Sequence, residues 1–143
     1  MKRLYPAAIV LSMLSCLIVT GCSAENASSV ISEAIPENIT HIEVSGFYHG
    51  ELEPWELTQT EIEELDTWIA QLSLTHRTYA EGEAPNEVYA GGVCYRFDIN
   101  DGEMSFTWIH IDQAYLQYDG GWYEITNTTA PPLGLAGPGR SVD

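Results

Sequence analysis

Basic residues are scarce in this sequence. It has five lysines and arginines against 21 aspartates and glutamates, which gives a formal net charge of −16 at pH 7. A surface of this sign repels phosphate backbones, so the composition argues against nucleic acid as a partner. Cationic peptides, amine-bearing wall polymers or divalent ions match the charge better, although a strong net charge also serves solubility alone.

Cysteine is scarce as well, with only Cys16, Cys22 and Cys94. Cys16 belongs to an N-terminal leader, and Cys22, which directly follows the leader, is expected to be modified. Cys94 is then the single free thiol of the remaining chain, and an intramolecular disulfide is excluded. No base and orienting group accompany Cys94 in a recognisable motif, and we interpret it as a small strand residue, not a nucleophile. The domain must therefore be held together by packing.

The N-terminus has the pattern of a signal peptide. Lys2 and Arg3 precede an apolar run from Ala7 to Val19, which is shorter than the roughly 18 to 20 residues needed to cross a bilayer. Polar residues end the run, and no positively charged stop-transfer cluster follows. We therefore assign residues 1–21 to a leader that is removed.

The end of the leader, Val19-Thr20-Gly21-Cys22, resembles the lipobox of bacterial lipoproteins. This resemblance implies that Cys22 receives a diacylglycerol thioether and becomes the first residue of the mature protein. The partner would then be the lipid bilayer, and the location the extracytoplasmic face of the cell membrane. Each buried methylene contributes about 0.8 kcal/mol, so two or more acyl chains hold a protein there stably.

The mature chain is long enough for one domain. Residues 22–37 are small, polar and acidic, and we interpret them as a lipidated tether. Residues 38–126 carry the apolar periodicity of a folded domain. Residues 127–143 are rich in proline and glycine, and the composition predicts a disordered tail.

One helix is predicted over residues 58–72. Its apolar stripe is Ile62, Leu65, Ile69 and Leu72. Thr58 followed three residues later by Glu61 is a capping-box pattern, which marks the start of the helix.

Alternating apolar residues predict strands at about 39–48, near Leu74, and at 93–99, 104–108, 115–118 and 121–125. Asp101-Gly102 and Asp119-Gly120 are typical of two-residue hairpin turns. The predicted fold is α+β: one amphipathic helix packs on an antiparallel sheet of about five strands that ends in a C-terminal meander.

The turns also predict which residues share a face of the sheet. Their register places Tyr95, Phe97, Leu116 and Tyr123 under the helix, together with Val93 and Ile99. Arg96, Gln117 and Trp122 then point to the opposite face, where we expect them to contact a ligand. The alternative is that the tether or the tail covers this face.

No motif in the sequence predicts catalysis or a cofactor. His41 and Glu43 share a strand face but lack a second ligand pair, and the acidic turn from Asp98 to Glu103 lacks the spacing of a calcium loop. We therefore assign no metal, cofactor or catalytic residue.

The sequence favours a non-catalytic binding module for a cell-envelope polymer or peptide. Two alternatives stay open: an acidic inhibitor or immunity-type protein, and a hydrolase that uses two carboxylates. The surface should distinguish them, because the first needs a contiguous aromatic patch, the second a convex acidic ridge and the third a cleft with two facing carboxylates.

Overall fold

The computed structural model describes residues 27–48, 50–85, 92–127 and 130–133. The two helices are α1 (Ala27–Ala34) and α2 (Gln59–Ala70). The strands are β1 (Ile42–Phe47), β2 (Glu51–Glu56), β3 (Leu74–Arg77), β4 (Val93–Ile99), β5 (Met104–His110), β6 (Ala114–Tyr118) and β7 (Gly121–Ile125). Within the described residues, no helix has the length and apolar character needed to cross a membrane.

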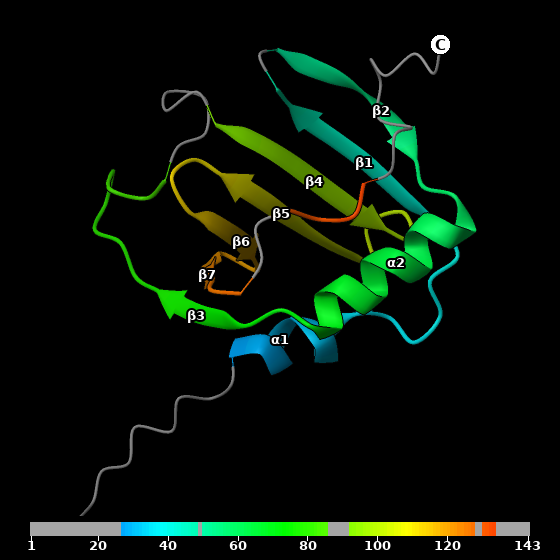
Figure 1. Cartoon of the computed structure of the whole chain (residues 1–143), viewed down its shortest axis with the longest axis horizontal. Helices are drawn as coiled ribbons and strands as arrows, with labels where there is room; N and C mark the ends of the chain where they lie inside the picture. Colours follow the sequence, from blue (N-terminus) through cyan, green and yellow to red (C-terminus); the bar gives the residue numbers. More distant parts are fainter. Residues whose placement is uncertain (1–26, 49, 86–91, 128–129, 134–143) are drawn as a thin grey trace, which may run out of the picture.

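The strands form one antiparallel sheet in the order β2-β1-β4-β5-β6-β7-β3, with α2 lying across one face (Figure 1). The α+β class is confirmed, but the sheet has seven strands where about five were predicted, and there are two helices where one was predicted. The strand missed from the sequence is β2. It contains Pro54 and three glutamates, a composition that argues against a central strand and is tolerated at a sheet edge.

Helix α2 begins as its sequence predicts. The Thr58 N–H donates to Glu61 Oε2 at 2.8 Å, and the Glu61 N–H donates to Thr58 Oγ1 at 3.4 Å. These two hydrogen bonds form the capping box. The buried residues of the helix are Ile62, Leu65, Trp68 and Ile69.

Loss of this cap should be measurable. We expect Thr58→Ala to lower the free energy of unfolding by about 0.5–2 kcal/mol, because the Glu61 N–H loses its acceptor, the Thr58 hydroxyl. Glu64→Gln on the exposed side of α2 serves as the control and should change it by less than about 0.5 kcal/mol. Urea denaturation followed by tryptophan fluorescence measures both. If Thr58→Ala lowers the free energy of unfolding no more than Glu64→Gln does, the cap does not stabilise the helix.

The second hairpin turn has the predicted two-residue form, since pairing continues to Tyr118 and Gly121. In the first hairpin the strands end at Ile99 and Met104, and Asn100 also has a positive φ of 50°. Asp101 and Gly102 have φ of 56° and 92°, and Asp119 and Gly120 have φ of 46° and 74°. Positive φ at both central residues is the requirement of a type I′ turn, which Gly satisfies without strain. Ile99 accordingly faces Met104, and Tyr118 faces Gly121.

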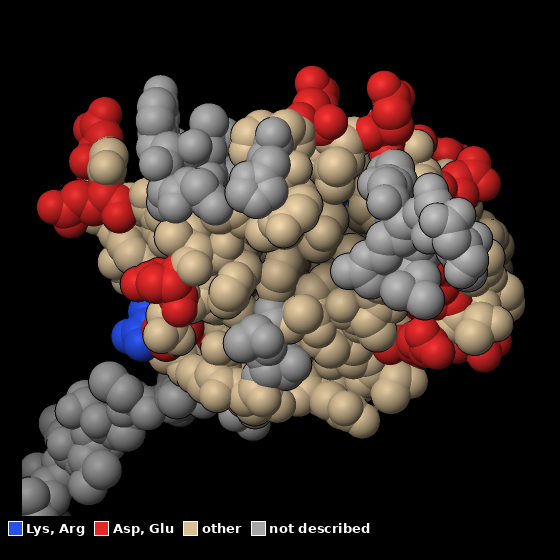
Figure 2. All heavy atoms as spheres, turned by 45° about the horizontal axis from the view of Figure 1, so that its top comes forward, with Lys and Arg blue, Asp and Glu red and all other residues tan. Residues whose placement is uncertain are grey.

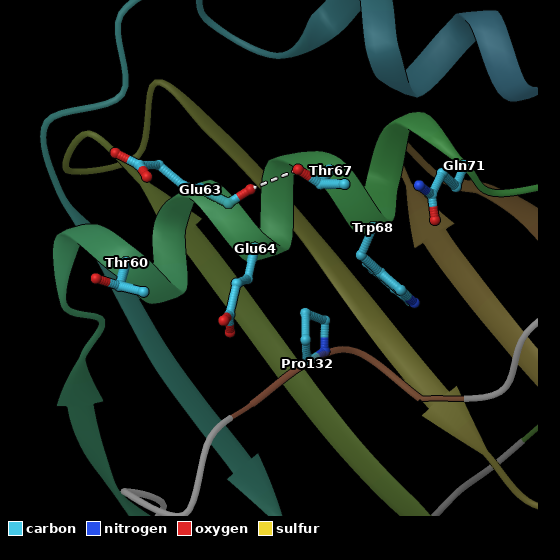
Figure 3. A pocket seen from close by; sticks show the side chains of 7 residues that line it. All are labelled: Thr60, Glu63, Glu64, Thr67, Trp68, Gln71 and Pro132. Carbon is cyan, nitrogen blue, oxygen red and sulfur yellow. Dashed lines mark hydrogen bonds between the residues drawn. The ribbon is translucent and has the colours of Figure 1, made fainter.

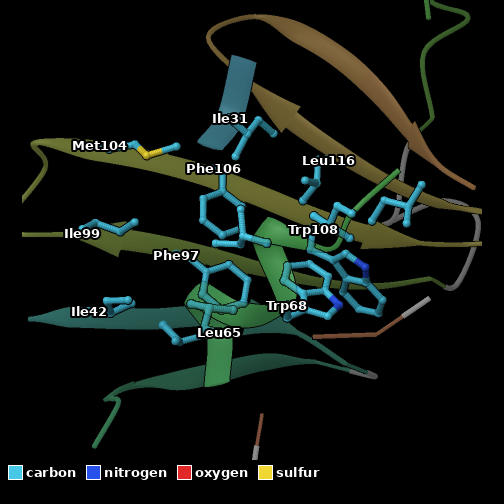
Figure 4. Close-up of a cluster of buried hydrophobic side chains, with 14 of the residues drawn as sticks. Ile31, Ile42, Leu65, Trp68, Phe97, Ile99, Met104, Phe106, Trp108 and Leu116 are labelled. Carbon is cyan, nitrogen blue, oxygen red and sulfur yellow. The ribbon is translucent and has the colours of Figure 1, made fainter. Parts of the chain in front are cut away.

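The core lies between the sheet and the helices, as the register predicts (Figure 4). Phe97 on β4 and Phe106 on β5 are buried at its centre, with ring centroids 4.7 Å apart. The predicted inward residues Leu116 and Tyr123 belong to the same cluster, whereas Val93 and Tyr95 are half-buried at its edge.

Helix α1 differs from the prediction of a tether. Residues 27–34, which were placed in the tether, are helical, and Ile31 is 0% exposed within the core. The apolar side chains Ile31, Ala34 and Ile35 recur at helical spacing, which explains why this short segment packs. Cys22 and the rest of the tether before Ala27 lie outside the described residues.

The part of the predicted tail at 130–133 also packs. Pro131 is buried and Leu133 contacts the core cluster. Proline disfavours a helix or a central strand, but an extended segment that contains proline can still pack its side chains against the core. Of the remaining tail, only Asn127 is described, and it bonds to the end of α2: its amide accepts from the Ser73 N–H and donates to the Gln71 carbonyl.

Candidate binding face of the sheet

The face of the sheet opposite the helices carries a polar row across five adjacent strands. The cross-strand register aligns Arg96 with Thr107, Thr107 with Gln117, Gln117 with Trp122, and Trp122 with Arg77. We call these five residues the polar row. Arg96, Gln117 and Trp122 therefore share one face, as their predicted positions require, and they lie in a single line.

Arg77 is the member of the row that the sequence reasoning missed. It lies on β3, which follows α2 in the chain but pairs with β7, the last strand. The sequence predicts a short strand near Leu74, but it does not indicate which strand pairs with it. That partner is determined only by the tertiary structure. Arg77 consequently stands next to Trp122, which is 45 positions away.

Three aromatic rings surround this end of the row. The Trp122 ring lies 5.9 Å from that of Tyr79 at an interplanar angle of 83°, and 6.2 Å from that of Tyr115 at 81°. We call these three residues the aromatic cluster. All three side chains are half-buried, so each presents part of its ring at the surface. An aromatic cluster at the surface is the feature that would favour the binding-module hypothesis.

The phenol of Tyr115 stays protonated at physiological pH. Burial raises the pKa of Tyr115 to about 12, and further contributions come from nearby Tyr79, from the Asp112 carboxylate, from a hydrogen bond with Tyr79 and from Glu124. Tyr115 is therefore neutral, and its hydrogen bond with Tyr79 links two members of the aromatic cluster.

The two arginines of the row have different surroundings. The Arg77 Nε donates to Glu124 Oε2 at 2.6 Å, and a second guanidinium nitrogen pairs with the same oxygen. Arg96 is exposed and donates to the Ser105 hydroxyl at 3.3 Å. Among the described residues Arg96 is in no ion pair, so its charge is available to a ligand.

The neighbouring row on the same face is closed to solvent at its centre. Ile109, aligned between Cys94 and Tyr115, is only 1% exposed. The polar row and the aromatic cluster are among the accessible parts of this face. The described parts of the predicted tether and tail lie on the opposite side, since Ile31 and Leu133 both join the helix-side core. Within these residues, the alternative that tether or tail covers the binding face finds no support.

A hollow of about 440 Å³ lies on the helix side, between α2 and the segment at 130–133. It is lined by Thr60, Glu63, Glu64, Thr67, Trp68, Gln71 and Pro132. Figure 3 shows the Glu64 carboxylate directed toward Pro132 and the Glu63 carboxylate directed away from it. The two carboxylates do not face each other, so this hollow is not the cleft that a hydrolase of this kind needs.

Acidic side chains are spread around the visible surface in Figure 2 and do not gather into one ridge there. Across the described residues, no group of three or more His, Cys, Asp or Glu side chains is placed to hold a metal ion. The His41 Nδ1 lies 4.0 Å from Glu56 Oε2, and its Nε2 lies 3.9 Å from Asp101 Oδ1. Both carboxylates are exposed to solvent.

No family model matches the sequence, and comparisons with curated proteins and with solved structures find no match. The function is therefore argued from the sheet face itself.

Proposed function

We propose that this protein is a binding module of the cell envelope, anchored to the extracytoplasmic face of the membrane through a lipidated Cys22. Its binding surface is the open sheet face, and its ligand is an envelope polymer or peptide. The observation that carries the proposal is the alignment of Arg96, Gln117 and Trp122 in one row that ends at an aromatic cluster.

The chemistry of this face is suited to recognition. A half-exposed indole offers a large contact area at little cost in conformational entropy, and the flanking amide, hydroxyl and guanidinium groups supply directional hydrogen bonds. Side chains that project from the strands of a sheet stand on a rigid backbone, which holds them in fixed relative positions. A lipid on Cys22 would keep this face near the envelope polymers on the outer side of the membrane.

The test is co-sedimentation of the full chain with isolated cell-wall polymer, in a nonionic detergent that carries no sugar. We expect Trp122→Ala and Arg96→Ala each to lower the bound fraction, with a dissociation constant raised about tenfold or more for Trp122→Ala. Arg96→Ala should change the free energy of unfolding by less than about 0.5 kcal/mol, because the side chain is exposed.

Trp55→Ala is the matched control. Trp55 is also half-buried, but it lies on the helix side of β2, where its ring contacts Tyr95. Binding should survive this change even though some stability is lost. If Trp122→Ala and Arg96→Ala bind as well as the unchanged chain, the sheet face is not the site. If binding is unchanged in Trp122→Ala and Arg96→Ala but is lost at high salt, the acidic inhibitor alternative is favoured instead.

A further inference from the structure

The segment at 130–133 lies across the helix side of the sheet, beside α2 (Figure 3). Pro131 is buried, and Leu133 packs against the core cluster. The two prolines have no backbone N–H, and the Leu133 N–H donates to the Pro131 carbonyl at 2.8 Å. Among the described residues, the segment forms no hydrogen bond with the rest of the domain. Because apolar packing is its main contact there, the segment can be released without breaking the sheet.

Two buried indole N–H groups of the described chain have no acceptor. They belong to Trp68 on α2 and Trp108 on β5, whose side chains are 9% and 4% exposed. A buried donor without an acceptor is rare in folded proteins. Trp68 also lines the hollow beside the segment, together with Pro132, and Figure 3 shows its indole extending from α2 toward the segment. The groove between α2 and the sheet therefore contains a donor that its present occupant does not use.

The segment uses one of its carbonyls for a turn of its own. The hydrogen bond from the Leu133 N–H to the Pro131 carbonyl joins residues two apart, as in a γ-turn centred on Pro132. A fully extended peptide would lack this turn, and its carbonyls would be available to an indole N–H. The groove is thus better suited to an extended chain than to the segment that lies in it.

The wall of the hollow formed by α2 is acidic. Among the described residues of its lining, only Glu63 and Glu64 are charged. Glu63 accepts a hydrogen bond from the Gln59 amide, whereas Figure 3 shows the Glu64 carboxylate directed toward Pro132. Within this part of the chain Glu64 forms no hydrogen bond and no ion pair. A basic side chain at the position of Pro132 would therefore meet an unpaired carboxylate.

We propose that this groove binds an extended peptide in which proline is followed by a basic and then an apolar residue. The segment at 130–133 occupies the groove when the peptide is absent. The peptide's proline and apolar residue take the places of Pro131 and Leu133, and its basic residue contacts Glu64. Aromatic grooves suit such segments, since proline has little conformational freedom to lose. The groove and the polar row lie on opposite sides of the sheet, so the inference is independent of the proposed function.

Fluorescence anisotropy of a labelled peptide, Gly-Ala-Pro-Arg-Leu-Gly, tests the site with the full chain in a nonionic detergent. In the unchanged chain the peptide must displace a segment that is tethered beside the groove at high effective concentration. Leu133→Asp places a charge against the core and should release the segment. We therefore expect this variant to bind the peptide about tenfold or more tightly than the unchanged chain does.

Two other variants at the same position control this result. Leu133→Met keeps the apolar contact and should bind the peptide as the unchanged chain does. Leu133→Ala weakens the contact without adding a charge and should give a smaller increase in affinity, which keeps the test available if Leu133→Asp does not fold. If no Leu133 variant binds the peptide more tightly than the unchanged chain, the segment is an ordinary part of the core and the inference is wrong.

The indole donor is tested in the Leu133→Ala background. Trp68→Phe keeps an aromatic ring but removes the N–H, and it should weaken peptide binding about threefold or more. Trp122→Phe is the matched control, because it removes an indole N–H from the other face of the sheet, and the affinity for the peptide should not change. If Trp122→Phe weakens binding as much as Trp68→Phe does, the peptide binds to the sheet face and the groove is not its site.

The charge of the peptide tests the contact with Glu64. A peptide with glutamate in place of arginine should bind about tenfold or more weakly, and Glu64→Gln should remove most of this difference. Asp66→Asn is the control, because Asp66 is exposed on α2 but does not line the hollow. Equal effects of Glu64→Gln and Asp66→Asn would overturn the assignment of the basic residue to this groove. Wall-polymer capture depends on Trp122, so the proposed function and this inference can fail separately.

Discussion

Phe97→Ala is expected to lower the free energy of unfolding by about 3–5 kcal/mol, which is enough to unfold a large fraction of a domain of marginal stability. Phe97 is 0% exposed, stacks on Phe106 with centroids 4.7 Å apart, and is aligned with Val44 on the other neighbouring strand. The truncation removes most of an aromatic side chain from the centre of a sheet whose neighbours cannot collapse into the cavity.

Phe47→Ala is the control for this prediction. Phe47 is half-buried and lies on the face away from the helices, opposite Cys94 in the register. Because it buries less area, its truncation should cost about 1–2 kcal/mol. Urea denaturation followed by the fluorescence of the four tryptophans measures both variants. If Phe47→Ala proves as costly as Phe97→Ala, the core does not lie on the helix side alone.

Cys22→Ala is expected to abolish lipidation and to leave the leader attached. The thiol is the proposed acyl acceptor, and the neighbouring Ser23 cannot form a thioether. Radiolabelled palmitate, together with the apparent mass of the chain, reports both steps. Cys94→Ala, which removes the half-buried thiol on β4, serves as the control and should keep the label. Label retained in Cys22→Ala, or absent from the unchanged chain, would refute the lipoprotein proposal.

Much of the binding face follows from local sequence. Asp101-Gly102 and Asp119-Gly120 adopt positive φ at little cost, so each turn sets the pairing of the strands beside it. Because side chains alternate along a strand, that pairing decides that Arg96 and Phe97 point to opposite faces. The positions of Gln117 and Trp122 follow in the same way, since all these pairings join neighbours in the chain.

The rest depends on partners that are distant in the sequence. Strand β3 pairs with β7, which brings Arg77 beside Trp122, and neither segment alone specifies the other. Strand β2 is stable only as an edge, where Pro54 and its glutamates do not interrupt a neighbour.

The sequence by itself therefore determines the capped helix α2, the two tight turns and the face on which Arg96 lies, because each arises from interactions among residues close in the chain. Only the tertiary structure decides that Ile31 from the segment before the sheet enters the core, and that five strands align their side chains into one row. Such contacts form where burying apolar surface outweighs the entropy of closing long loops, a balance that depends on the whole chain.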